Sequence, residues 1–316
     1  MPLLTTDAAG VHVIAPTPFD EKAALDLVST ARMIERYLAM GATGLTILGM
    51  MGEAPKLTAA ENRLFVKEVL ARVGSRAAVT VGVSSPGFAA MADLTKAVMD
   101  MGASGVMIAP TPSLRTDDQI VSYFADAAEA VGADVPFVLQ DYPQATNVVM
   151  TPQVIARIIA ANPSCVMLKH EDWPGLDKIT VLRRMERNGE LRRVPILTGN
   201  GGMFLPYEME RGADGAMTGY AYPEMLVGVV KLCRAGKRGE AHDLFDRHLP
   251  LVRYETQPGI GLGVRKYVLK KRGLIAHDTL RKPGPRLSPE TIADIEWLMA
   301  RIEARSVEAQ ARDIAA

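Results

Sequence analysis

The 316-residue chain carries 36 basic and 36 acidic residues, and 48% of its residues are hydrophobic. This neutral balance gives no electrostatic footprint for nucleic acid or for an anionic membrane surface, and no uncharged apolar run reaches the ~18 residues that a membrane span requires. Its 2 cysteines are too few for a disulfide framework or a metal-ligand cluster, and the N-terminus lacks a signal-peptide pattern. We therefore expect a globular protein in a reduced, cytoplasmic setting, with no metal site and no bound cofactor.

Short apolar segments alternate with segments of helical periodicity along most of the chain. The apolar segments predict strands at 11–16, 45–48, 78–83, 106–109, 137–140, 166–169, 194–198 and 215–218. Helices are predicted between them at 25–40, 117–130, 151–161, 176–186 and 204–211. One further helix begins at about residue 58, and another ends at residue 101. The helix near residue 58 begins with a capping-box pair, Thr58 and Glu61.

This strict alternation determines the predicted fold class. Fully apolar strands that alternate with helices favour a parallel sheet covered by helices on its outer side. Eight such units match the (β/α)8 TIM barrel. A doubly wound open sheet is the alternative, but no Gly-x-Gly-x-x-Gly turn follows the first strand. We predict a barrel over residues 8–223 and a C-terminal helical extension over 224–316, with helices at 227–235, 238–252, 262–271 and 289–305.

The sixth apolar segment runs directly into Lys169. In barrels of this type the active site is built at the C-terminal ends of the strands, and Lys169 is the one lysine among the predicted strand ends. Loss of hydration disfavours the charged form of an amine, and a neutral amine can attack a ketone to give a Schiff base. The alternative is that Lys169 is merely the first solvated residue after a strand.

Other strand ends supply candidate substrate-binding residues: Gly49, Met50, Met51, Glu53, Gln140, Thr198, Asn200 and Thr218. The two methionines are better suited to form a pocket wall than to hold a polar ligand. Glu53 could bind a substrate, but we favour a structural role in which it binds backbone amides of neighbouring loops. The hydroxyl and amide side chains could hydrogen-bond a sugar or, as often happens, cap a loop.

Several of these features together resemble the dihydrodipicolinate synthase and N-acetylneuraminate lyase superfamily of Schiff-base aldolases. The matching features are the turn at 49–53, the Pro143 turn after the fifth strand, Lys169, Gly199 and Gly215, and the likeness extends from about residue 10 to 302. The resemblance implies that Lys169 forms an imine with the keto carbon of pyruvate or of a longer 2-oxo acid. It also implies a homotetramer.

The chain departs from the superfamily at residues that matter for chemistry. In the superfamily, hydroxyls and backbone amides of the turn after the second strand hold the substrate carboxylate. Here Met50 and Met51 replace the hydroxyl residues, so only backbone N–H groups could hold a carboxylate there. The catalytic tyrosine of the fifth strand falls at Gln140, and the arginine that the lysine-biosynthesis enzyme uses for its aldehyde falls at Ala145. Tyr142 follows Gln140 by two positions, so its side chain could face the same side.

A closer resemblance is to the 2-keto-3-deoxy-sugar-acid dehydratases, carried by segments 138–143, 170–175, 215–219 and 255–260. These enzymes use the same imine and then remove water from the sugar chain. We therefore predict a Schiff-base lyase that acts on a 2-oxo acid, as a dehydratase or an aldolase. A pyruvate-condensing enzyme of the dihydrodipicolinate synthase type is one alternative, and a non-catalytic 2-oxo-acid-binding protein is another.

The predicted catalytic residues are Lys169, Tyr142 and Glu171. Glu171 lies two residues after the lysine, so in an extended strand both side chains would share one face, although a solvated or capping carboxylate is equally compatible with the pattern. Tyr142, Glu53 and His170 are the other candidates for the base that removes a substrate proton. His170 should point away from the lysine and fits a structural histidine better.

Overall fold

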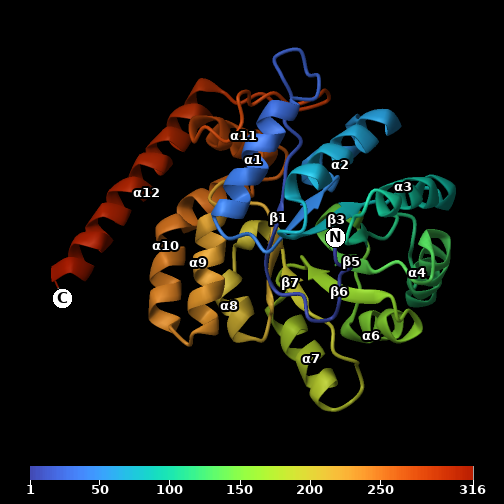
Figure 1. Cartoon of the computed structure of the whole chain (residues 1–316). Helices are drawn as coiled ribbons and strands as arrows, with labels where there is room; N and C mark the ends of the chain where they lie inside the picture. Colours follow the sequence, from blue (N-terminus) through green and yellow to red (C-terminus); the bar gives the residue numbers. More distant parts are fainter. Residues whose placement is uncertain (316) are drawn as a thin grey trace.

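The computed structural model describes the backbone of residues 1–315 and the side chains of residues 1–307. Eight parallel strands form a closed barrel in which consecutive strands are neighbours and β8 pairs with β1 (Figure 1). This order confirms the predicted TIM barrel and excludes the open doubly wound sheet. The strands are β1 (Gly10–Ile14), β2 (Gly44–Ile47), β3 (Ala78–Gly82), β4 (Gly105–Ile108), β5 (Phe137–Asp141), β6 (Cys165–His170), β7 (Ile196–Thr198) and β8 (Gly215–Thr218).

Helices follow the strands and cover the outside of the barrel (Figure 1). The predicted capping box is present at the start of one of them, where Thr58 Oγ1 accepts from the Glu61 N–H at 3.2 Å and Glu61 Oε2 accepts from the Thr58 N–H at 2.9 Å. The helices around the barrel are α1 (Leu27–Ala39), α2 (Ala59–Val73), α3 (Phe88–Asp100), α4 (Asp117–Val131), α5 (Pro143–Thr146), α6 (Pro152–Ala161), α7 (Leu176–Arg187) and α8 (Leu205–Glu210). Short 3-10 turns lie at η1 (Met50–Gly52), η2 (Ala54–Lys56) and η3 (Asn200–Gly202).

The C-terminal part of the chain is helical, as the sequence predicts. Its helices are α9 (Pro223–Arg234), α10 (Arg238–Glu255), α11 (Gly261–Lys271) and α12 (Pro289–Ala315). Helix α9 packs on β1 and β8 and thereby closes the ring of helices, while α10 packs against α9, α11 and α12. The long α12 runs along the outside of the molecule to the C-terminus (Figure 1).

Successive side chains of each strand point alternately into and out of the barrel, and this alternation produces two separate apolar regions. Side chains that point outward pack against the helices, while a second cluster fills the barrel interior with Ile14, Met107, Val138, Met167, Leu197 and Met217. Positions two residues further along the same strands face the same side at the C-terminal mouth of the barrel. The interior cluster thus forms an apolar floor beneath the residues that end β5, β6, β7 and β8.

Candidate active site

Lys169 lies where the sequence places it, at the C-terminal end of β6 and on the inner face of the barrel. It follows the interior residue Met167 by two positions and is only 4% exposed. Gln140, its register partner on β5, is equally buried. The Lys169 Nζ lies 2.6 Å from Glu171 Oε1, so the amine and a carboxylate form an ion pair directly above the apolar floor.

Glu171 turns back over β7 instead of extending into solvent. Its Oε1 accepts from Gln140 Nε2 at 2.7 Å, and its Oε2 lies 3.4 Å from the Asn200 N–H. Asn200 Nδ2 also donates to the Glu171 carbonyl at 2.8 Å. A Cβ on Gly199 would lie 2.2 Å from Glu171 Cγ, so the absence of a side chain at Gly199 makes room for the carboxylate. Glu171 is therefore a buried, oriented group beside Lys169.

Tyr142 lies just after β5, at the N-cap of α5, and is half-buried. Burial and the nearby Glu171 carboxylate raise the pKa of Tyr142, whereas the positive charge of Arg265 lowers it. The phenol therefore stays protonated near neutral pH and can donate a hydrogen bond, but it is a poor base.

The turn after β2 contributes apolar surface. Met51 packs on the interior apolar cluster, and Met50 is exposed. Glu53 is buried in an ion-pair network with Lys266 Nζ at 2.7 Å and Lys56 Nζ at 2.9 Å. It also accepts from the N–H of Arg281 at 3.0 Å, which ties the turn to the segment after α11. The geometry gives Glu53 a structural role.

The threonines at the ends of β7 and β8 are not brought to the lysine. Thr198 Oγ1 donates to the Gly215 carbonyl at 3.4 Å, and Thr218 Oγ1 accepts from the Gly201 N–H at 2.8 Å. Both follow interior residues by one position and so face the outer layer. His170 faces the same layer, where its ring nitrogens contact Asp141 Oδ2 at 3.3 Å and the Gly175 carbonyl at 3.1 Å.

Sequence reasoning missed one charged residue at the barrel mouth, Arg265 of α11. It is 3% exposed, its Nε pairs with Glu255, and its Nη2 donates to the Gly219 carbonyl at 2.6 Å. No local pattern could identify it, because the residue that it contacts at the end of β8 lies 46 positions away in the chain.

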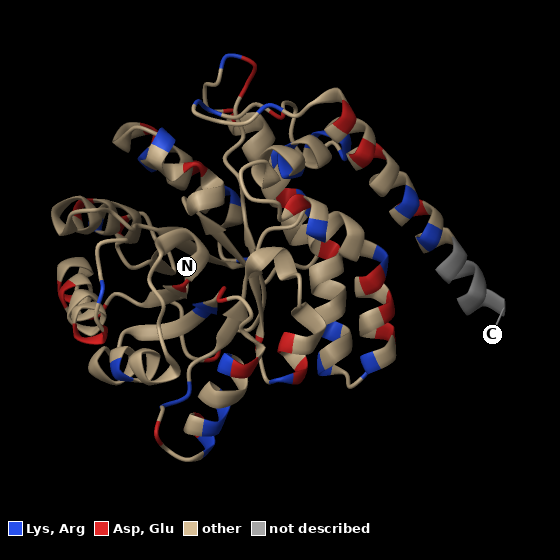
Figure 2. Cartoon of the chain, turned by 180° about the vertical axis from the view of Figure 1, so that it is seen from behind, with Lys and Arg blue, Asp and Glu red and all other residues tan. Residues whose placement is uncertain are grey.

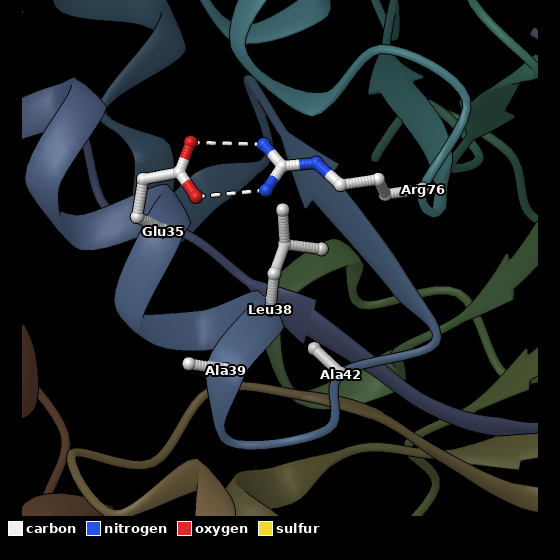
Figure 3. A pocket seen from close by; sticks show the side chains of 5 residues that line it. All are labelled: Glu35, Leu38, Ala39, Ala42 and Arg76. Carbon is white, nitrogen blue, oxygen red and sulfur yellow. Dashed lines mark hydrogen bonds and ion pairs between the residues drawn. The ribbon is translucent and has the colours of Figure 1, made fainter.

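A surface hollow of about 320 Å³ lies at the other end of the barrel, between α1 and the loop before β2 (Figure 3). Arg76 spans it with two 2.8 Å hydrogen bonds to Glu35, and Leu38, Ala39 and Ala42 complete the lining. Because Ala42 precedes β2, this hollow is at the N-terminal ends of the strands, away from Lys169.

Charged residues of both signs are interspersed over the outer helices (Figure 2), in keeping with the balanced composition. In the part of the chain that the structure describes, no three His, Cys, Asp or Glu side chains are grouped to hold a metal ion. Among the same residues, no helix has the length and apolar character needed to cross a bilayer.

Comparisons with known proteins agree with this architecture. The model of the dihydrodipicolinate synthetase family matches residues 7–300. A crystal structure of dihydrodipicolinate synthase from Rhodopseudomonas palustris is 57% identical and superimposes with a TM-score of 0.94, covering 95% of this chain and 100% of that one. L-2-keto-3-deoxyarabonate dehydratase from Azospirillum brasilense is 26% identical, covering 93% of this chain and 94% of the relative. 4-Hydroxy-tetrahydrodipicolinate synthase 1 from Streptomyces coelicolor is 31% identical, again covering 93% and 94%. The chain therefore belongs to the dihydrodipicolinate synthetase family.

Proposed function

We propose that this protein is a Schiff-base lyase that joins Lys169 to the keto carbon of a 2-oxo acid, most simply a 2-keto-3-deoxy sugar acid that it dehydrates or cleaves. The supporting observation is the buried 2.6 Å contact between Lys169 Nζ and Glu171 Oε1. The proposed nucleophile, the Lys169 amine, and the proposed acid–base group, the Glu171 carboxylate, thus lie within direct proton-transfer distance above an apolar floor.

The reaction begins with a proton transfer from the Lys169 ammonium to the Glu171 carboxylate. The neutral amine attacks C2 of the 2-oxo acid, and the resulting hydroxyl takes the proton back from Glu171 and leaves as water. A cationic imine remains, and it acidifies the protons on C3. Glu171, again a carboxylate, takes a C3 proton, and that proton departs with the C4 hydroxyl as a second water in the dehydratase reaction. One water then hydrolyses the imine and frees Lys169 and the product, so that one water is lost overall. Cleavage of the C3–C4 bond is the aldolase alternative.

Gln140 favours a role for Glu171 as the proton carrier. An amide can orient a carboxylate, but it cannot accept and release protons near neutral pH. Gln140 Nε2 donates to the same Oε1 that meets Lys169, so its contact orients Glu171 and leaves the proton to move between two groups only. In this proposal Tyr142, which stays protonated, donates a hydrogen bond to a substrate oxygen.

A pyruvate-condensing activity of the dihydrodipicolinate synthase type is the second candidate. It is favoured by the 57% identity to the Rhodopseudomonas palustris protein of that name. Against it, the chain has Ala145 where the lysine-biosynthesis enzyme carries an arginine for its aldehyde, and Gln140 in place of the relay tyrosine.

The test of imine chemistry is mass spectrometry of the intact protein after incubation with pyruvate and borohydride. We expect one pyruvate-sized adduct on the wild type and none on Lys169→Ala. Lys178→Arg is a matched control, because Lys178 is nearby but is bound to Asp141 at 2.9 Å and to Asp172 at 2.7 Å in the outer layer. Failure of the wild type to trap pyruvate or any longer 2-oxo acid would favour a non-catalytic binding protein.

Product analysis then separates the proposed lyase, whether dehydratase or aldolase, from a condensing enzyme. A dehydratase removes one water from a 2-keto-3-deoxy sugar acid, and an aldolase releases pyruvate from it, in both cases without a second substrate. A condensing enzyme consumes pyruvate only when an aldehyde is added. Pyruvate consumption that depends on an aldehyde, with no change in any sugar acid, would refute the lyase assignment.

A further inference from the structure

The turn after β2 is held in a backbone conformation that its own residues do not favour. Leu48 and Glu53, which flank it, have φ angles of 54° and 55°, in the left-handed region where a residue with a side chain is strained. Such conformations persist only where surrounding contacts hold them. Met51 of this turn packs on the interior apolar cluster, so the turn forms part of the wall at the barrel mouth.

The direction of the backbone matters in this turn because its side chains are apolar. Met50 and Met51 carry no hydrogen-bond donor, so an acid can bind here only through backbone N–H groups. Inside the turn, the Gly52 N–H donates to the Gly49 carbonyl at 2.9 Å and the Glu53 N–H donates to the Met50 carbonyl at 3.1 Å. Because these short-range bonds act on a strained backbone, contacts from outside the turn decide whether its N–H groups keep their direction.

Lys266 of α11 supplies a fully buried contact of this kind. Its Nζ lies 2.7 Å from Oε1 of Glu53, which is also buried. The same Nζ donates to the Thr279 carbonyl at 2.9 Å and lies 4.4 Å from the centre of the Phe19 ring. Lys266 thus joins the turn to the segment after α11 and to the segment after β1.

Two further cationic residues contact Glu53, but neither matches Lys266. Lys56 Nζ lies 2.9 Å from Glu53 Oε2, and the backbone N–H of Arg281 donates to the same oxygen at 3.0 Å. The Lys56 side chain is 24% exposed, and the Arg281 guanidinium pairs with Glu61 instead. Water screens the attraction between exposed charges, so the buried Lys266 contributes the strongest hold on the Glu53 carboxylate.

We propose that Lys266 is a positioning residue, which holds the Met50–Gly52 turn through Glu53 and thereby lowers the concentration of 2-oxo acid needed to form the imine. This inference rests on the proposed function and adds to it a part of the C-terminal extension on which the site depends. Lys266 is fully buried against Glu53 and Phe19, so it acts through the turn and not on the reacting atoms.

The test replaces the buried pair as a unit, with Lys266→Met and Glu53→Gln in one protein, so that no unpaired buried charge remains between them. Methionine is close to lysine in length and packs well against an aromatic ring such as that of Phe19. Hydrogen exchange followed by mass spectrometry measures the turn directly and needs no ligand, so it is independent of the imine chemistry. We expect residues 49–57 to exchange roughly 10-fold faster in the double variant, with β6 as protected as in the wild type. Exchange at the wild-type rate in residues 49–57, or equal acceleration in β6, would overturn the proposal.

Trapping with pyruvate and borohydride then measures binding. The double variant should need a roughly 10-fold higher pyruvate concentration for half-maximal trapping, because apparent affinity falls with the fraction of molecules in which the turn keeps its binding shape. The maximal trapped fraction should stay at the wild-type level, since Lys169 and Glu171 are unchanged. A faster-exchanging turn combined with an unchanged half-maximal concentration would overturn the proposal, and so would loss of trapping at every concentration.

Arg183→Met with Asp214→Asn is the matched control. Arg183 is also buried and lies 2.5 Å from Asp214, but Asp214 precedes β8 and so lies at the N-terminal end of the barrel. The control should leave the exchange of residues 49–57 and the half-maximal pyruvate concentration unchanged. A shift as large as that of the double variant would attribute the effect to lower stability alone and would overturn the proposal.

The pH dependence of the same measurement tests the charge of Lys266. Burial lowers its pKa to about 8, Glu53 raises this pKa, and the positive charges of Lys56 and Arg281 lower it further. Lys266 therefore loses its charge as the pH rises above about 8, and the hold on the turn weakens. The ratio of half-maximal pyruvate concentrations, double variant to wild type, should be smaller at about pH 9 than at about pH 7, and effects of pH on the imine chemistry itself cancel in this ratio. An equal ratio at both pH values would overturn the proposal, because the charge of Lys266 would then not be what holds the turn.

Discussion

Glu171→Gln separates the charge of the central carboxylate from its shape. Oε1 lies 2.6 Å from Lys169 Nζ and 2.7 Å from Gln140 Nε2. A glutamine can keep its oxygen in this position, so both contacts survive as hydrogen bonds, and the side chain still fills the gap left by Gly199. The variant loses the negative charge, the ability to accept a proton and the long 3.4 Å contact with the Asn200 N–H, because an amide NH2 group cannot accept a hydrogen bond.

We expect this change to slow the exchange of pyruvate C3 protons in D2O by roughly 10²–10⁴-fold, which is the usual contribution of one general base. Proton NMR of the methyl signal follows the exchange. The rate is divided by the fraction of enzyme that borohydride traps as the imine, so that slower imine formation does not enter the result.

Glu208→Gln is the control for exchange, because Glu208 is a buried carboxyl on α8, outside the barrel interior. It should leave the exchange rate per imine unchanged. Exchange at the wild-type rate in Glu171→Gln would refute the reasoning, because another group would then be removing the C3 proton.

Two further predictions use the same positions. Gly199→Ala should displace the Glu171 carboxylate, because the new Cβ would lie 2.2 Å from Cγ, and we expect pyruvate trapping to persist while C3 exchange falls; undiminished exchange would contradict this. Burial raises the pKa of Glu208 to about 7, so the folded protein binds this proton more tightly than the unfolded chain, and stability should fall as pH rises from about 4.5 to about 7, by at most about 3 kcal/mol. Glu208→Gln should remove this dependence, which urea unfolding at about pH 5 and about pH 8 measures, and an equal slope in both proteins would argue against it.

The part of the site that lies on strands could be predicted from the sequence. The apolar run before Lys169 marks a buried strand, and the structure extends the predicted 166–169 by only one residue at each end. Two-residue alternation then places Gln140 and Lys169 inside the barrel and His170 outside it, because a pleated strand leaves no other choice. Where the backbone is a regular strand, the local sequence pattern is sufficient to predict which side chains face the barrel interior.

The part of the site that depends on loops and distant helices could not be predicted in the same way. Glu171 lies beyond β6, and its position is determined by contacts with Gln140 and Asn200 and by the missing side chain of Gly199. The partners lie 29 to 31 positions away in the chain. Arg265 is further removed still, since it reaches the barrel from α11. Such contacts exist only once the barrel has closed, so no sequence window contains them.

The glycine after β7 also suggests how one barrel can support different reactions. A side chain on a strand is fixed to the inner or outer face by the pleat, so replacing it changes the packing of the barrel itself. Here β7 is followed by Gly199, and the Glu171 carboxylate enters the space beside it from the loop after β6, where a substitution leaves the apolar floor intact. The Glu171 carboxylate lies 2.6 Å from Lys169, and this arrangement would give the imine a proton acceptor that is not part of the barrel wall. Gln140 completes this arrangement, because it orients the Glu171 carboxylate without accepting its proton.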